Sequence, residues 1–209
     1  MCDIIKHRGL DGDGFWKSEH SDIIFGHRRL TITDKSASGV QPLIRDNYVI
    51  VFNGEVYNYR EIREQLISFV FISTCDTEVI LNAYIYWGKK CIDYFNGMWS
   101  FIIFDPIKNQ IFISRDRYGI KPFYYFIKNN QLYFSSEIKS FTVLKDWNAK
   151  VNKNIAYDFL YNGFVNHTDH TFFEDIFELR GGNNLIINLE KSTFYIKHYY
   201  LLENQKSIS

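Results

Sequence analysis

The chain has 209 residues, of which 46% are apolar and 23% are charged, which fits one globular domain with a sizeable core. Its 24 Lys and Arg residues balance 24 Asp and Glu residues, so broad electrostatic attraction to nucleic acid or anionic lipid is not expected. Its apolar runs fall far short of the ~18 residues that span a bilayer. Asp3, Lys6 and Arg8 stand where a signal peptide would be apolar. We therefore expect a cytoplasmic protein that binds neither nucleic acid nor membrane.

Short apolar runs bounded by turn residues dominate the chain and are typical of strands. In chain order they cover residues 23–27, 48–52, 98–105, 110–116, 123–127, 132–136, 184–189 and 193–199. The four runs between 98 and 136 are spaced as in an antiparallel meander, and the last two as in a hairpin. Aromatic residues make up 18% of the chain, which favours a large core rich in strands.

Helical signals fall between these strands. Asn58 followed by Glu61 resembles a helix N-cap with its reciprocal acid, opening a helix through about residue 66. Apolar residues recur at helical spacing over 76–89, and 138–144 and 153–161 are shorter candidates. Strands in runs with helices in pairs predict an α+β fold with antiparallel sheets.

Cys2, Cys75 and Cys91 are an odd number of cysteines, with neither a C-x-x-C pair nor histidines at ligand spacing. We therefore predict no metal site and no disulfide framework. His27 and the chain's later histidines show no pairing with a candidate nucleophile, which favours structural or solvated roles for them.

Four clusters could carry chemistry, and each has a plain structural alternative. The Gly-rich segment 7–14 brings backbone close to a ligand or simply makes sharp bends. An arginine in Gly26–Leu30 could clamp a carboxylate or lie on a strand surface. Asn53-Gly54 offers oxyanion donors or a hairpin turn. Asp76, in Cys75-Asp76-Thr77-Glu78, could bind an ammonium group or cap a helix.

Taken in order, these clusters resemble the glutaminase domain of glutamine-hydrolysing asparagine synthetases, which are class II glutamine amidotransferases. The family's motifs match the segments 7–14, 26–32, 41–42, 53–58, 76–80, 97–101, 115–125 and 135–139. The similarity runs from Ile4 to about Tyr200. It predicts a glutamine amidotransferase domain over 1–200 and a polar tail over 201–209.

The resemblance implies an αββα sandwich of two mainly antiparallel sheets, as in N-terminal-nucleophile hydrolases. In that family the initiator Met is removed, and the new terminal Cys attacks the side-chain amide of glutamine with its own amino group as base. By position Cys2 would be this nucleophile.

The matched motifs also imply a binding site for L-glutamine. Arg29 would bind the α-carboxylate and Asp76 the α-ammonium. Asn53 and Gly54 would stabilise the oxyanion, and Glu55 would line the substrate pocket. Cys75 replaces the family's serine, and we expect it to be buried and inert.

Two departures from the family pattern limit these expectations. The S-G-G-x-D-S loop of the ATP-dependent synthetase part has no counterpart, since Gly181-Gly182 is followed by two asparagines. Only four residues separate Cys2 from His7, a span of about 18 Å when fully extended. The first strand of the family therefore does not fit, and we expect an N-terminally shortened fold with an exposed sheet edge.

Two hypotheses about function follow. The chain hydrolyses glutamine to glutamate and ammonia for asparagine synthesis, or it is a glutamine-binding module without a proper nucleophile, in which Met1 aligns with an internal methionine of the family. The glutaminase step needs no cofactor, because ATP and Mg²⁺ belong to the synthetase part. The expected partners are L-glutamine, a separate ATP-dependent synthetase chain and a second copy of the chain.

Overall fold

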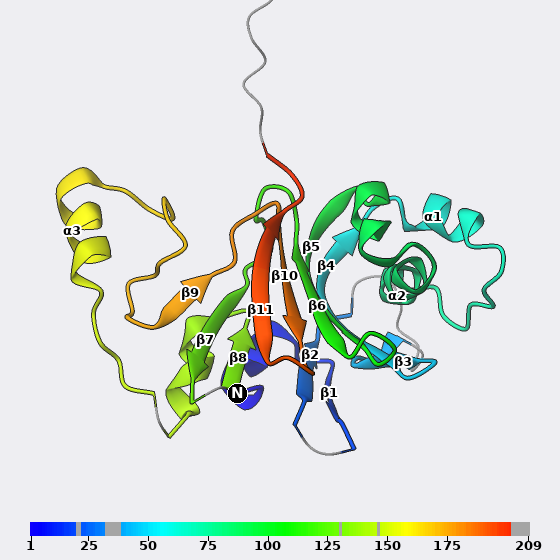
Figure 1. The fold of residues 1–209 in the computed structure, drawn as a ribbon, viewed down its shortest axis with the longest axis horizontal. Coiled ribbons are helices and arrows are strands. Elements are labelled where there is room, and N and C mark those ends of the chain that lie inside the picture. Colours follow the sequence, from blue (N-terminus) through cyan, green and yellow to red (C-terminus); the bar gives the residue numbers. More distant parts are fainter. Residues whose placement is uncertain (20–21, 32–38, 130, 146, 202–209) are drawn as a thin grey trace, which may run out of the picture.

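The computed structural model describes residues 1–19, 22–31, 39–129, 131–145 and 147–201, and within these the chain is an α+β fold (Figure 1). The strands are β1 (Gly12–Lys17), β2 (Ile24–Arg29), β3 (Leu43–Arg45), β4 (Tyr48–Val56), β5 (Gly97–Asp105), β6 (Gln110–Arg115), β7 (Tyr124–Lys128), β8 (Gln131–Ser135), β9 (Ile176–Glu178), β10 (Asn183–Asn188) and β11 (Thr193–His198). The helices are α1 (Tyr59–Gln65), α2 (Asp76–Trp87) and α3 (Lys153–Asn162). The 3₁₀ segments within the described residues are η1 (Asp3–Arg8), η3 (Gly88–Tyr94) and η4 (Ile138–Val143).

A six-stranded antiparallel sheet in the order β11-β10-β6-β5-β4-β3 forms the centre of the fold. Its longest pairing joins β4 to β5, from Val49 opposite Phe104 to Val56 opposite Gly97. β6 is buried along its whole length, because both faces of the sheet are covered. Its centre, Ile111–Ile113, is apolar without a break, as is typical of a strand that is covered on both faces.

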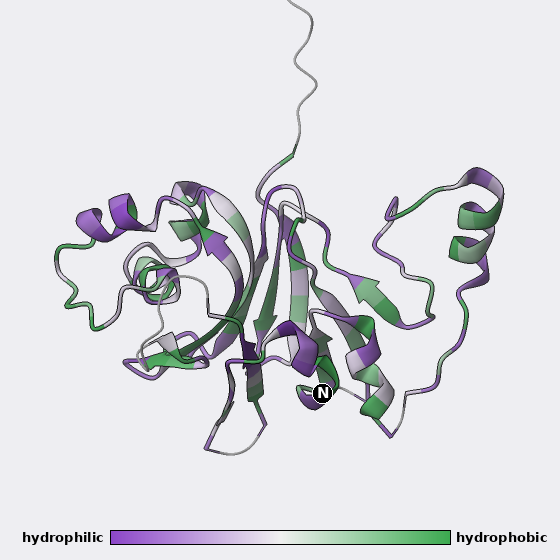
Figure 2. Ribbon diagram, turned by 180° about the vertical axis from the view of Figure 1, so that it is seen from behind, coloured by the Kyte–Doolittle hydropathy of each residue, from purple (hydrophilic) through white to green (hydrophobic). Residues whose placement is uncertain are grey.

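The layers follow from what covers each face of this sheet. On one face, α1 and α2 pack over a core that includes Trp99, Phe101 and Tyr84. On the other face lie the sheets β1-β2 and β8-β7-β9, joined to it through a second core that includes Phe25 and Ile113. η4 and Met1 pack against the far side of β7. Figure 2 shows the hydrophobic residues along these strands between the layers. The predicted α+β fold with antiparallel sheets is confirmed.

Several predicted elements differ in the structure. The meander breaks after β6, because β7 and β8 leave the central sheet and join the second layer, and β10 pairs with β6 instead. β4 runs on through Asn53 and Gly54, so this pair forms no hairpin turn. Asn58 precedes α1, but its side chain bonds Tyr94 O and Asn96 N rather than capping the helix. β1, β3 and β9 were not predicted from the sequence.

The second layer consists of two separate sheets. Among the described residues, β2 pairs with β1 alone and β8 pairs with β7 alone. Within this part of the chain each strand therefore has one unpaired edge, and the rings of Phe25 and Phe134 meet between them at 5.9 Å. No helix in the described part of the chain is long and apolar enough to cross a membrane. Of the predicted tail, residues 202–209 lie outside the described residues.

Candidate functional site

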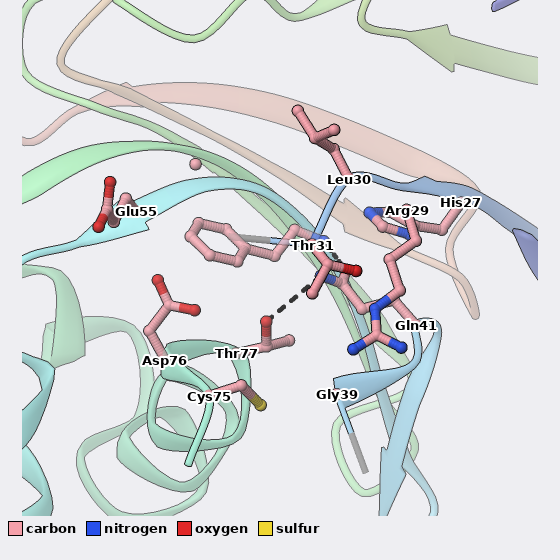
Figure 3. A pocket seen from close by; sticks show the side chains of 12 residues that line it. His27, Arg29, Leu30, Thr31, Gly39, Gln41, Glu55, Cys75, Asp76 and Thr77 are labelled. Atoms are coloured by element: carbon pink, nitrogen blue, oxygen red, sulfur yellow. Dashed lines mark hydrogen bonds between the residues drawn. The ribbon is translucent and has the colours of Figure 1, made fainter. Parts of the chain in front are cut away.

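A pocket opens where the end of β2, the middle of β4 and the start of α2 meet (Figure 3). Four of the residues predicted to bind or stabilise glutamine contribute to its wall, although they come from three separate motifs. The lining residues are His27, Arg29, Leu30, Thr31, Gly39, Gln41, Phe52, Gly54, Glu55, Cys75, Asp76 and Thr77. The fold therefore brings together Arg29, Gly54, Glu55 and Asp76.

Asp76 begins α2, and its carboxylate lies between the end of β4 and the first backbone N–H groups of the helix. Its Oδ2 accepts a hydrogen bond from the backbone N–H of Val56 at 3.0 Å. Burial raises the pKa of Asp76 to about 6, the Val56 hydrogen bond opposes this shift, and the nearby Glu55 adds to it. The side chain is therefore a poorly solvated anion at neutral pH. A cation that binds beside such a carboxylate stabilises its ionised form.

Gln41 holds the two sides of the pocket together. Its Oε1 accepts from the backbone N–H of Phe52 at 2.6 Å, and its Nε2 donates to Thr77 Oγ1 at 3.3 Å. The dashed line in Figure 3 marks the second of these bonds. Gln41 thus ties β4 to the first turn of α2. The Gln41-Pro42 motif pointed to this residue, but nothing in its sequence context indicated a bridging role.

β2 presents Arg29 and His27 to the pocket from the same face, because side chains alternate along a strand. Burial lowers the pKa of His27 to about 4, against the opposing effect of a hydrogen bond to the backbone of Phe52. His27 is therefore neutral at physiological pH. The sequence predicts a structural or solvated role for His27. Its place in the pocket wall was not predicted, because the ligand-binding role in this motif was assigned to Arg29.

The backbone of segment 7–14 approaches other backbone closely. A Cβ on Gly9 would lie 2.6 Å from the carbonyl groups of Arg28 and Arg29, and one on Gly14 would lie 2.1 Å from Gln41 O. The glycines of this motif therefore let the loop pack against β2 and the Gln41 segment. The sequence left open whether these glycines bring backbone close to a ligand or make sharp bends. In the structure they bring backbone close to other backbone of the same chain.

The two predicted oxyanion donors are neighbours on β4 but face opposite ways. Gly54 lines the pocket, and a Cβ there would lie 2.2 Å from Met98 O on β5. Asn53 is not among the lining residues, and its Nδ2 lies 3.5 Å from Ser136 Oγ. The structure therefore brings Gly54, but not the side chain of Asn53, to the pocket.

Cys2 lies on the other face of β2. The Cβ that Gly26 lacks would fall 2.5 Å from Cys2 Sγ, and Arg28 Nε donates to Cys2 O at 3.1 Å. Gly26 and Arg28 alternate with His27 and Arg29, so the Cys2 thiol and the pocket are on opposite sides of the strand. Burial raises the pKa of the Cys2 thiol, although the N-terminal ammonium and Arg28 oppose this. The structure does not bring Cys2 into the pocket.

Cys75 is the thiol that does line the pocket. It is buried, and its Sγ lies 3.0 Å from Ser73 Oγ, which in turn donates to Glu78 Oε2 at 2.6 Å. Burial raises the pKa of the Cys75 thiol, while the contact with Ser73 opposes this. A thiol with a raised pKa carries little thiolate at neutral pH and is a weak nucleophile. The structure agrees with the expectation that Cys75 is buried.

Two matched motifs that lie far apart in the sequence meet at Glu137. His7 Nε2 lies 2.8 Å from Glu137 Oε1, Arg8 donates to the same oxygen at 3.1 Å, and Lys139 lies 3.1 Å from Oε2. Burial alone would raise the pKa of Glu137, but the hydrogen bonds from Lys139, His7 and Arg8 outweigh it and hold the pKa at about 2. These contacts bind η1 to η4, so this cluster of charged and polar side chains holds the N-terminal segment in place.

The motif over 115–125 is also structural. Arg115 makes a buried ion pair with Glu178 at 2.8 Å and donates to Lys121 O and Gly119 O at 2.7 Å each. Asp116 accepts from the backbone of Ile120 and Lys121 at 2.9 Å. These bonds fix the turn that carries the chain from the central sheet to β7. Among the described residues, no cluster of His, Cys, Asp and Glu could hold a metal ion.

Comparison with known proteins finds a family match that includes every residue lining the pocket. The sequence profile of the family described as "Glutamine amidotransferase domain" matches residues 1–200. The chain is 38% identical over 228 residues to a Methanocaldococcus jannaschii protein that carries the name asparagine synthetase [glutamine-hydrolyzing] 2. This match takes in 100% of the chain and 44% of that protein. Asparagine synthetase [glutamine-hydrolyzing] 3 of Bacillus subtilis is 34% identical, over 99% of this chain and 34% of its own length.

A solved structure supports the fold. Glutamine phosphoribosylpyrophosphate amidotransferase from B. subtilis matches with a TM-score of 0.68 at 17% identity, over 96% of this chain and 46% of that one. This similarity shows the fold alone. The chain spans less than half the length of each of these three proteins.

Proposed function

The chain belongs to the class II glutamine amidotransferase family, related to the glutamine-hydrolysing asparagine synthetases, and on this premise we propose that its pocket binds L-glutamine. The observation that carries the proposal is the convergence of Arg29 and Asp76 on one pocket. A cationic fork and a carboxylate across one cavity match the α-carboxylate and α-ammonium of an amino acid. With the side chain of the ligand held as a third point, these two contacts select one hand at the α-carbon.

Each end of the ligand has a defined partner in this proposal. The guanidinium of Arg29 takes the α-carboxylate, and the carboxylate of Asp76 takes the α-ammonium. Gly54 and Glu55 then line the remaining space, where the side-chain amide lies. A carboxylate at this end would be repelled by Glu55, so L-glutamate is expected to bind more weakly than L-glutamine.

The raised pKa of Asp76 adds a second argument. Burial leaves this carboxylate poorly solvated, and its backbone hydrogen bond from Val56 fixes its orientation. An ammonium group in the pocket would replace the missing solvation and lower the pKa of Asp76 again. Binding is therefore expected to weaken as the pH falls below about 6, the pKa of Asp76 in the free protein.

Hydrolysis of the bound glutamine is the second candidate function, and family membership favours it. The Cys2 thiolate, exposed at the new N-terminus after removal of Met1, would attack the amide carbon, with Asn53 and Gly54 donating to the oxyanion. Ammonia would leave, and water would then release glutamate from the thioester. This route requires Cys2 to move from the outer face of β2 to the pocket face, since its thiol lies against Gly26. It also requires the side chain of Asn53, which lies beside Ser136, to turn towards the bound amide. Without these movements the chain remains a glutamine-binding module.

The wider role is proposed from the relatives. In a cytoplasmic asparagine-forming system, the ammonia would pass to a separate chain that uses ATP and Mg²⁺ to activate the acceptor. The glutaminase step itself uses protein groups without a cofactor. This assignment rests on the names of relatives that are more than twice as long as the chain.

Calorimetric titration of the purified chain tests glutamine binding. L-glutamine is expected to bind, D-glutamine and L-glutamate to bind at least tenfold more weakly, and Asp76→Asn to lose binding. Asp93→Asn removes an exposed carboxylate away from the pocket and is the matched control. Absence of L-glutamine binding to the folded chain, or full binding by Asp76→Asn, would contradict the proposal.

An electrophilic diazo-ketone analogue of glutamine separates hydrolysis from binding alone. A covalent adduct on a Met-processed Cys2, mapped by mass spectrometry, would show that the thiol reaches the bound ligand. A folded chain that binds L-glutamine but gives no adduct is a binding module. Labelling of Cys75 would identify the pocket thiol as the reactive one and refute the role of Cys2.

A further inference from the structure

Gln41 contacts all three walls of the pocket that is formed by the end of β2, the middle of β4 and the start of α2. It is 8% exposed and lines the pocket. Its side chain reaches two of the walls, since Oε1 accepts from Phe52 N on β4 at 2.6 Å and Nε2 donates to Thr77 Oγ1 on α2 at 3.3 Å. Figure 3 shows the bond that joins Gln41 to Thr77. Both ends of the Gln41 amide are therefore bonded within the protein.

The backbone of Gln41 is packed towards the third wall. A Cβ on Gly14 of β1 would lie 2.1 Å from Gln41 O and 3.2 Å from Pro42 Cδ, so the Gln41 segment lies directly against β1. Gly14 pairs with His27 of β2, and Arg29 follows two residues later on the same face of that strand. Gln41 is therefore linked through β1 to the strand that carries Arg29.

The side-chain contacts of Gln41 are close in sequence to residues assigned to the ligand. Thr77 directly follows Asp76 at the start of α2, and Phe52 stands two residues before Gly54 on β4. Gln41 itself is assigned to no part of the ligand, because both polar atoms of its side chain are bonded to protein groups. It is therefore placed to set the distances between the groups that bind the ligand.

Stability alone does not require an amide at this place. Replacing both partners of a buried hydrogen bond by apolar groups can be nearly neutral, so apolar contacts would join β4 to α2 about as well. An amide bonded at both ends adds direction, because hydrogen bonds form only over a narrow range of distance and angle. The bond from Val56 N to Asp76 Oδ2 also joins β4 to α2, but it uses the carboxylate that is assigned to the ligand. Gln41 joins them without using a ligand-binding group.

The distance between the two charged walls matters because of the geometry of the ligand. In an α-amino acid the carboxylate and the ammonium group are attached to one carbon atom. A β-amino acid has one more C–C bond, of about 1.5 Å, between these groups. A site that distinguishes the two must hold its own groups to within about 0.5 Å.

We propose that Gln41 is a positioning residue that fixes the span between Arg29 and Asp76 and thereby makes the pocket selective for α-amino acids over their β-homologues. This inference rests on the proposed binding of L-glutamine. Gln41 acts through β2 and α2 and does not touch the ligand. When its bond to Thr77 is lost, the start of α2 is free to shift away from β2, and the longer ligand then fits about as well as the shorter one.

Calorimetric titration with L-glutamine and with L-β-homoglutamine, which has one methylene more between carboxylate and ammonium, tests the proposal. The wild-type chain should prefer L-glutamine at least thirtyfold. Thr77→Val keeps the shape of the side chain but removes the bond to Gln41, and it should reduce this preference to less than fivefold. Thr77→Ser keeps the hydroxyl and should restore the preference. Thr142→Val makes the same change on an exposed residue outside the pocket and should behave like wild type.

A double-mutant comparison shows whether Thr77 acts through Gln41 or on the ligand itself. Gln41→Leu alone should reduce the preference as Thr77→Val does. In the Gln41→Leu background, Thr77→Val should then change the preference by less than twofold. If Thr77→Val still reduced the preference in this background, the Thr77 hydroxyl would act on the ligand directly, and the positioning role of Gln41 would be refuted.

Hydrogen exchange of the ligand-free chain tests the bridge by itself. In Thr77→Val the Phe52 amide, which donates to Gln41, should exchange at least tenfold faster than in wild type, whereas the Ile103 amide, on β5 between β4 and β6, should be unchanged. An unchanged Phe52 amide would overturn the proposal. A wild-type chain that fails to bind L-glutamine would refute the proposed function and this inference together. A Thr77→Val chain that binds L-glutamine with the wild-type preference would refute this inference alone.

Discussion

Replacing Asp76 by Asn should stabilise the ligand-free protein, although it removes a residue of the proposed binding site. Burial raises the pKa of Asp76 from 3.8 to about 6, so keeping the group ionised in the folded state costs free energy. Two pKa units correspond to about 3 kcal/mol, which is the upper limit of the expected gain. Asparagine is neutral and can still accept the hydrogen bond from Val56 N, so the substitution keeps the geometry and removes the charge.

The pH dependence gives this prediction its sign. Between pH 3.8 and about 6 the folded state holds the proton more tightly than the unfolded state, so this group makes the free energy of unfolding fall as the pH rises. Wild type and Asp76→Asn should therefore be equally stable near pH 3.5. At pH 8 the variant should be more stable by about 1–3 kcal/mol.

Urea unfolding at pH 3.5, 5, 6.5 and 8 measures the difference, with Asp93→Asn as the control that should stay within about 0.5 kcal/mol of wild type. Addition of saturating L-glutamine should reverse the order, because the ligand stabilises only the protein that binds it. If Asp76→Asn were less stable than wild type at pH 8 without ligand, the hydrogen bonds to the carboxylate would outweigh its burial. The argument that the buried Asp76 carboxylate is destabilised until an ammonium group binds beside it would then be wrong.

Three further substitutions test other parts of the structure. Arg115→Met leaves the buried Glu178 with the longer ion pair to Arg180 at 3.9 Å and should lower the free energy of unfolding by about 3–5 kcal/mol, whereas the exposed Arg60→Met should leave the transition unchanged in the same denaturation assay. Glu137→Gln should cost about 1–2 kcal/mol at pH 7, and this loss should vanish as the pH falls from 4.5 towards the folded-state pKa of about 2. Gly54→Ala forces a Cβ against Met98 O and should cost about 1–3 kcal/mol, while Gly12→Ala, with open space around it, should cost little by thermal unfolding.

The fold was predictable where local patterns agreed with tertiary contacts. α2 was predicted from residue 76, where its N-terminus lies, because apolar spacing and a polar start both point there. β1 was missed because Gly12 and Gly14 weaken any strand pattern, and their fit depends on close packing against distant backbone. The break of the meander after β6 depends on Arg115 and Asp116 fixing a turn between layers, which no local pattern shows.

The candidate site could be predicted only in part for a similar reason. Arg29, Gly54, Glu55 and Asp76 lie in matched motifs, and the structure places them around one pocket. The bridging role of Gln41 depends on contacts that link segments 11 and 36 residues away along the chain.

For Cys2 the motif match and the position in the structure disagree. A motif match assigns it a role by its number in the chain. Its thiol nevertheless lies against Gly26 on the face of β2 away from the pocket. The face on which a side chain lies depends on how the short segment before His7 packs, and sequence spacing could only indicate that this segment is too short for a strand.

A crystal structure of the chain with L-glutamine tests the central claim most directly. The account predicts one L-glutamine in the pocket, with its α-carboxylate on Arg29, its α-ammonium on Asp76 and its side-chain amide beside Gly54. An empty pocket at saturating L-glutamine, or a ligand bound with its two ends reversed, would contradict it.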